Sequence, residues 1–165
     1  MSCQRVTISR LTGGPIFRGW ARSASGDTAQ VIAWIEHGIA DWATTGATLV
    51  LPYYLALKAE ALYLADRTSE ALEAISEAEA LVERFEDRHW CADLHRLRGM
   101  FLAAVDADET QIEASFGEAI RIAKEQKSVS LEKRAEVTYA EHRRQKASGS
   151  GGRRFRPVNL QSDVT

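Results

Sequence analysis

The chain has 165 residues, of which 45% are hydrophobic and 27% are charged, so it is long enough for one domain or a short array but not for two large domains. Its formal net charge of −2 gives no general attraction to nucleic acid or to an anionic membrane. The charge is unevenly placed: residues 1–140 carry 15 Lys or Arg against 21 Asp or Glu, whereas residues 141–165 carry 6 against 2. This asymmetry marks the C-terminal segment as a different kind of region.

The N-terminal segment and the cysteine content favour a soluble cytoplasmic protein. The stretch "MSCQRVTISRLTGGPIF" has no apolar core of signal-peptide length, and no run of 18 apolar residues occurs anywhere in the chain. Cys3 and Cys91 make no disulfide framework, which suits a reducing compartment. We therefore expect no membrane association.

The pattern between residues 15 and 145 is helical almost throughout. Alanine is abundant, and short segments with Gly, Asp, Thr or Ser, such as "TTGAT" and "ADRTSEA", interrupt the pattern at intervals of a helix length. Pro52 is expected in the first turn of a helix, where its missing N–H costs little. No stretch alternates convincingly enough to predict a strand. The predicted helices lie near residues 15–24, 28–44, 49–65, 69–85, 88–105, 109–126 and 129–145.

The predicted helices contain an internal repeat. Small residues recur at Gly19, Ala59, Gly99 and Ala140, with spacings of 40, 40 and 41 residues. Three further columns keep the same register, with one extra residue in the turn "VDADET". These columns are Val31, Ala71 and Ile112; Ile35, Ile75 and Phe116; and Gly38, Ala78 and Ala119.

The residue types of these columns have a physical explanation. Two helices pack closely only where small side chains lie at the crossing point, because the interaxial distance follows the side chains in contact. Large residues then fill the space between one helix pair and the next, and stacked neighbours supply a core that one pair cannot form alone. Gly99, inside a helix, is thus interpreted as a close-packing residue rather than as part of an active site.

The order small, Ala, large, small resembles the tetratricopeptide (TPR) pattern, with the repeat lengthened to about 40 residues. The segments "ADLHRLRG", "SFGEAIRIA" and "SLEKRA" resemble the TPR-like C-terminal arrays of large bacterial signalling ATPases, which often accompany adenylate/guanylate cyclase or DNA-binding domains. The resemblance covers roughly residues 17–140. It implies an all-α, right-handed TPR-like α-solenoid of antiparallel helix pairs, with about seven helices.

Two departures from that family limit what the resemblance implies. The phosphate-binding motif Gly-x-x-x-x-Gly-Lys-Ser/Thr is absent, and "TGGPIFRG" lacks its lysine, so no ATP or other cofactor is expected. After Ala140 the sequence becomes Gly-, Ser- and Arg-rich, which favours a truncated gene product with an unrelated tail. The expected organisation is an irregular segment over 1–14, a helical repeat domain over 15–145 and a disordered basic tail over 146–165.

The register of the resemblance predicts a partner-binding groove lined by the first helix of each pair. Aromatic side chains with a few charges are suited to anchoring a protein or peptide partner. Arg98, by contrast, is expected to pair with an acidic neighbour outside the groove. The predicted groove residues are Trp20, Tyr53, Glu60, Tyr63, Asp93, Arg96, Met100 and Arg134.

The sequence holds no catalytic constellation that we would assign, and we expect no enzyme. His89, Cys91, Asp93 and His95 have metal-ligand types, but no second cluster completes a four-ligand zinc site, so no metal is predicted. The glutamates of "EALEAISEAEALVE", among them Glu73 and Glu77, fit a solvated helix face better than a pair of catalytic acids.

Three function classes remain open at this point. The most favoured is a protein-interaction or sensory scaffold module of a bacterial nucleotide-dependent signalling or transcription regulator. The second is a self-associating remnant of a truncated cyclase or ATPase gene, in which a second copy covers the unfinished C-terminal repeat. The third, an enzyme, lacks a motif. The basic tail alone does not make nucleic-acid binding the favoured function, because no folded basic surface accompanies it.

Overall fold

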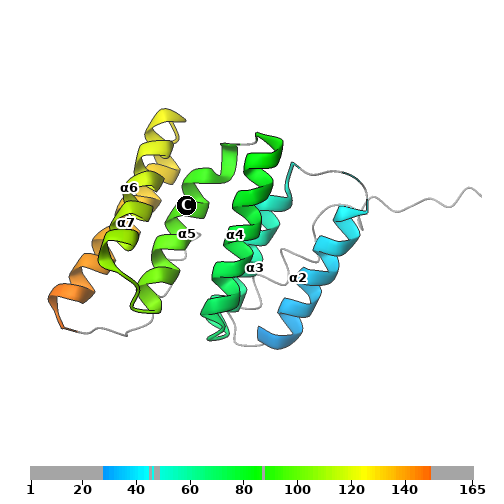
Figure 1. Cartoon of the computed structure of the whole chain (residues 1–165), viewed down its shortest axis with the longest axis horizontal. Coiled ribbons are helices and arrows are strands. Elements are labelled where there is room, and N and C mark those ends of the chain that lie inside the picture. The colour runs from blue at the N-terminus through cyan, green and yellow to red at the C-terminus, as the bar shows by residue number, and fades with distance from the viewer. Residues whose placement is uncertain (1–27, 45, 47–48, 87, 150–165) are drawn as a thin grey trace, which may run out of the picture.

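The computed structural model describes residues 28–44, 46, 49–86 and 88–149, and this part of the chain is helical without a strand. Figure 1 shows the helices side by side, with α2 at one end of the molecule and α6 and α7 at the other. The elements in chain order are α2 (Thr28–Ala43), α3 (Leu51–Leu64), α4 (Thr68–Phe85), the short 3-10 helix η2 (Arg88–Trp90), α5 (Cys91–Ala104), α6 (Glu109–Glu125) and α7 (Val129–Ala147).

These bounds confirm six of the predicted helices to within about two residues when η2 is counted with α5, and Pro52 lies in the first turn of α3 as expected. The predicted helix near 15–24, the segment 1–14 and residues 150–165 of the predicted tail lie outside the described residues. The beginning of that tail is different from the prediction, because α7 continues to Ala147. None of the helices in the described part of the chain has the length and apolar character that a membrane span requires.

The contacts between helices follow the order of the chain, with two additions. Each of α2 to α6 contacts the next helix in sequence, and α5 also contacts both α3 and α7. The second helices of the predicted pairs, α4 and α6, have no such extended mutual contact. The odd-numbered helices are therefore linked in series through α5, which contacts α3 on one side and α7 on the other.

The predicted columns form the core. In the three further columns, all the described members except Gly38, which is half-buried, are at most 2% exposed: Val31, Ala71 and Ile112; Ile35, Ile75 and Phe116; Ala78 and Ala119. Removing these apolar side chains from water supplies the main favourable contribution to folding, at roughly 25 cal/mol per Å² of buried apolar surface.

Gly99 lies where α5 packs closely against α6. A Cβ atom built at this position would lie 3.1 Å from the Cδ2, Cε2 and Cζ atoms of Phe116. Ala140 on α7, the last member of the same column of small residues, is exposed. Its predicted role in a close helix crossing is therefore wrong within the described structure. The physical reason is that no helix in the described part of the chain follows α7.

The backbone turns repeat with the same period as the side chains. Asp66, Glu86, Asp106 and Lys127 each follow a helix with a positive φ, between 51° and 63°. After three of these helices, the amide that follows the left-handed residue donates a hydrogen bond to a carbonyl oxygen in the last turn of the helix. Arg67 N donates to Leu62 O at 3.0 Å, Ala107 N to Leu102 O at 3.0 Å, and Ser128 N to Ala123 O at 2.9 Å. Asp66 and Asp106 lie 40 residues apart, whereas Ala71 and Ile112 lie 41 apart, so the extra residue falls between Asp106 and Ile112, at the turn "VDADET", as predicted.

Candidate functional site

A buried ion-pair network centres on Arg96 of α5. The Arg96 side chain is 6% exposed; its Nε donates to Asp93 Oδ1 at 2.8 Å and its Nη2 donates to Glu60 Oε1 at 3.3 Å. Asp93 is one helical turn before Arg96, whereas Glu60 comes from α3, 36 residues away in sequence. The guanidinium therefore joins two helices through charge-assisted hydrogen bonds, which are stronger than neutral ones.

Arg134 extends this network to α7. Its Nη1 lies 3.5 Å from Asp93 Oδ1, and its side chain is 41% exposed, so it forms the solvent-facing edge of the network. We refer to Glu60, Asp93, Arg96 and Arg134 as the polar cluster. Two carboxylates and two guanidiniums from α3, α5 and α7 thus meet at one place.

The repeat explains why these residues meet. Glu60 directly follows the small residue Ala59, and Asp93 and Arg96 precede Gly99 by six and three residues. Equivalent positions of successive repeats lie next to one another when repeats stack. Asp93 and Arg134 lie six residues before Gly99 and Ala140, so the repeat register places this pair side by side although the two residues are far apart in sequence.

Charge controls the ionisation of the cluster. Burial raises the pKa of the Asp93 carboxyl, but the adjacent Arg96 and Arg134 guanidiniums outweigh burial, so this pKa lies below its usual value. The pKa of the Tyr53 hydroxyl is raised, first by burial and then by the negative charges of Glu60 and Asp93. Asp93 is thus held ionised and Tyr53 protonated near neutral pH.

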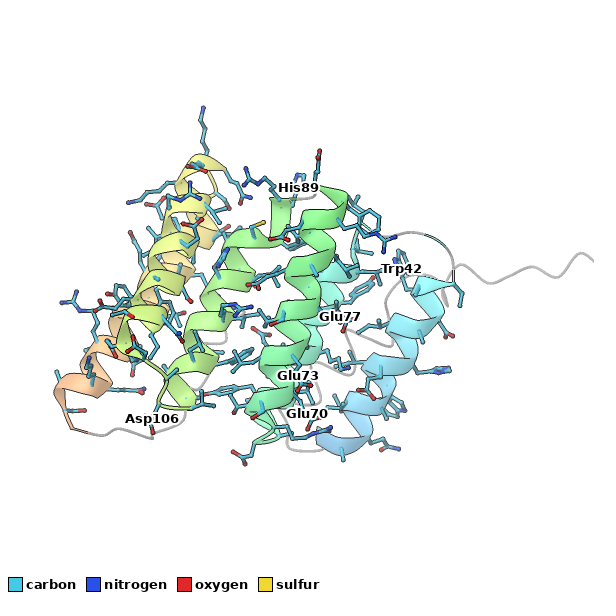
Figure 2. The ribbon with its side chains drawn as sticks, in the orientation of Figure 1. Trp42, Glu70, Glu73, Glu77, His89 and Asp106 are labelled. Atoms are coloured by element: carbon cyan, nitrogen blue, oxygen red, sulfur yellow. The ribbon has the colours of Figure 1, made fainter. Side chains whose placement is uncertain are left out.

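An aromatic row borders the polar cluster. Tyr53 of α3 stacks on Trp90 of η2, with ring centroids 4.4 Å apart and an interplanar angle of 26°. Tyr53 also contacts Tyr54, at 6.1 Å between centroids, and Tyr54 meets Trp42 of α2 edge-on at 5.7 Å. Figure 2 shows Trp42 between α2 and α3. Trp90 is not among the predicted groove residues; its place directly before α5, which holds Asp93 and Arg96, was the signal that it neighbours the site.

Three predicted groove residues are not part of this arrangement. Tyr63 and Met100 are 2% and 1% exposed, so their prediction as lining residues of a binding surface is wrong for this structure. Arg96, although part of the polar cluster, is 5% exposed and likewise does not present its side chain on that surface. Tyr63 lies in the core, where its ring is 5.1 Å from that of Phe101. Tyr63 and Met100 project into the packing between neighbouring helices because the 40-residue repeat buries this side of α3 and α5. Trp20 lies outside the described residues.

Arg98 makes the pairing expected of it. Its Nε donates to Glu79 Oε1 of α4 at 2.8 Å, and its Nη2 contacts Ser76 Oγ at 3.1 Å. The two arginines that flank Leu97 therefore have separate partners: Arg96 belongs to the polar cluster, and Arg98 fastens α5 to α4.

The other candidate chemistries lack a gathered site among the described residues. No three His, Cys, Asp or Glu side chains there are arranged to hold a metal ion, and Asp93 is occupied by two guanidiniums. Burial lowers the pKa of His95, an effect that the nearby carboxylates of Glu79 and Glu118 oppose. Glu73 and Glu77 are exposed on α4 and follow one side of that helix in Figure 2. They form the solvated face that the sequence predicted.

Comparisons with known proteins identify one relative. No family model matches the chain, and no solved structure matches it. The uncharacterized protein R02095 of Rhizobium meliloti (strain 1021) is 30% identical over 133 residues, which are 80% of this chain and 13% of that protein. The chain thus spans a small part of the length of the curated relative that it matches, and the similarity brings no activity with it.

Proposed function

We propose that the chain is a TPR-like array: a right-handed solenoid of antiparallel helix pairs whose first helices line a concave surface. Two features of the described residues support this architecture. Buried columns and left-handed turn residues recur with the same period of about 40 residues, and α3, α5 and α7 contact one another in series. Stacked helix pairs with small rotations between them generate such a surface.

On this surface the array binds a protein or peptide partner, as an interaction module of a bacterial nucleotide-dependent signalling or transcription regulator. The observation that carries this proposal is the polar cluster, because its four charged residues come from the three first helices that the structure describes, α3, α5 and α7, and are joined by direct ion pairs. The regulator context is supported by the resemblance to signalling ATPase arrays and by a relative of which this segment is a small part.

The chemistry of the proposed groove suits an extended peptide. Arg134 presents an exposed guanidinium, and the stacked Tyr53 and Trp90 are half-buried at its side. Aromatic and arginine side chains dominate the affinity of many interfaces because they bury a large area and donate several hydrogen bonds. The buried pairs of Arg96 hold the shape of the groove, whereas Arg134 and the two rings contact the partner.

A displayed library of random peptides tests the proposal even though the natural partner is unidentified. Peptides selected on the full chain are titrated against the wild type and against the variants Tyr53→Ala and Arg134→Ala. Loss of a central aromatic or arginine contact is expected to weaken binding by roughly tenfold or more, about 1.4 kcal/mol. Glu73→Ala on the exposed face of α4 is the matched control and leaves the affinity unchanged. Selected peptides that bind both groove variants as tightly as the wild type would place the binding surface elsewhere.

A further inference from the structure

One side of α7, which we call the α7 outer face, carries exposed side chains at intervals of three or four residues. Such spacing places them on one side of a helix. The opposite side of α7 holds its two buried residues, Ala135 and His142. The α7 outer face comprises Lys133, Glu136, Val137, Ala140, Arg144 and Ala147, all of them exposed.

The centre of this face is covered in the repeats of α3 and α5. Ala140 corresponds to Gly99 of α5, which packs against Phe116 of α6, and to Ala59 of α3, which is fully buried. The helices that follow, α6 and α4, contact α5 and α3 along their length. The face is therefore a helix-contacting face in α3 and α5, and in α7 it has no covering helix among the described residues.

The residue types on α7 are nevertheless different from those of the earlier repeats. Lys133, Glu136 and Arg144 occupy the register positions where α3 has buried Pro52, Leu55 and Tyr63. Charged side chains do not suit an apolar helix face such as the buried side of α4, which holds Ala71, Ile75 and Ala78, because burying an unpaired charge is costly. A partner that covered this face would have to supply opposite charges at matching positions.

We propose that the outer face of α7 pairs with the same face of a second copy of this chain, antiparallel about a two-fold axis at Ala140. Glu136 and Arg144 each lie four residues from Ala140, on opposite sides. An antiparallel alignment therefore sets Glu136 against the partner's Arg144, and the symmetry repeats this ion pair. At the centre Ala140 meets its own copy, and two small residues allow the helix axes to approach closely.

The described side chains are available for this pairing. Glu136 has no ion-pair partner within the described ranges, and the exposed Arg144 contacts only its helix neighbours, Glu141 Oε2 at 2.8 Å and the carbonyl oxygen of Ala140 at 3.5 Å. Val137, 38% exposed, lies beside Ala140 and adds apolar area to the interface. The pairing uses none of the polar cluster, so it is independent of the proposed peptide binding.

Charge reversal tests the alignment in the full chain. Sedimentation equilibrium from about 10 µM to about 1 mM protein at low salt is expected to show a monomer–dimer equilibrium. Glu136→Arg and Arg144→Glu each replace two attractive pairs by two repulsive ones, and each is expected to weaken dimerisation roughly tenfold. The double variant Glu136→Arg with Arg144→Glu restores the opposite charges and with them the dimer.

Glu73→Arg on α4 makes the same charge change away from the interface and leaves the dimer unchanged, while far-UV circular dichroism confirms that every variant is folded. A monomer over the whole concentration range would overturn the proposal. Single variants that dimerise like the wild type, or a double variant that stays as weak as the single ones, would also overturn it. In each of these cases peptide binding by Tyr53 and Arg134 is unaffected.

Discussion

Gly99 shows how a single residue position connects the sequence pattern to the packing. It lies in the interior of α5, where glycine costs about 1 kcal/mol relative to alanine, so another requirement must retain it. That requirement is the Phe116 ring, which approaches the missing Cβ to 3.1 Å and also stacks on Tyr139 of α7 at 5.2 Å. One ring is thus fixed between α5 and α7.

Gly99→Leu is expected to destabilise the protein. The larger side chain must displace Phe116, and overpacking of this kind costs typically about 1–3 kcal/mol, more than the gain in helix propensity of roughly 1 kcal/mol. Urea unfolding followed by circular dichroism measures the change in the free energy of unfolding.

Gly117 of α6 offers a matched control, because a Cβ there meets nothing within 4 Å. Gly117→Ala is expected to stabilise the protein by up to about 1 kcal/mol. If Gly99→Leu were as stable as the wild type, the close-packing role would be refuted.

At the scale of elements, the polar cluster ties α3, α5 and α7 together, and Asp93 is its common acceptor. Asp93→Asn removes the charge that compensates two guanidiniums, one of them buried, and we expect a loss of about 2 kcal/mol at pH 7. The folded-state pKa of Asp93 lies below the unfolded value, so its contribution is complete above the unfolded pKa near 4 and is lost as the pH falls through the folded value. Below about pH 4 the difference between the variant and the wild type should therefore shrink.

Urea titrations of both proteins between pH 7 and about pH 3 measure this dependence. Asp41→Asn is the control, because the Asp41 side chain is 71% exposed and its removal should change the unfolding free energy by less than about 0.5 kcal/mol. A constant difference between wild type and Asp93→Asn at every pH would show that the carboxylate charge is not the stabilising feature.

The extent of the elements could be predicted from the sequence, because Pro, Gly and short polar clusters interrupt the helical pattern at each end. The turn geometry could be predicted only in part. Gly46 and Gly149 have the positive φ that glycine usually signals after a helix. The other left-handed positions hold Asp66, Glu86, Asp106 and Lys127, which give no such signal. Among the site residues, Glu60, Asp93, Arg96 and Arg134 could be found from the repeat register alone. Burial could not be found that way, because it depends on how tightly neighbouring helices close over a position, as the residues wrongly assigned to the groove surface show.

At the scale of the whole molecule, a row of helices with neighbour contacts does not have uniform stability. Within the described part of the chain, α5 contacts α3, α4, α6 and α7, whereas α7 contacts only α5 and α6. In such arrays each unit is stabilised mainly by its neighbours, so a terminal element opens more easily than a central one. This graded stability has a measurable consequence for the amide protons of the two helices.

Native-state hydrogen exchange is expected to give amide protons of α5 an opening free energy at least about 2 kcal/mol higher than those in the last two turns of α7. The comparison is direct, since both are regular helices and both carry a residue of the polar cluster. These measurements are made at low protein concentration, at which the chain is monomeric. At high concentration, dimerisation through the α7 outer face should slow exchange in α7 and leave α5 unchanged, because ligation stabilises only the elements whose opening breaks the interface. Equal protection of α5 and α7 at low concentration would show that the helices unfold as one unit and not in order of their neighbours.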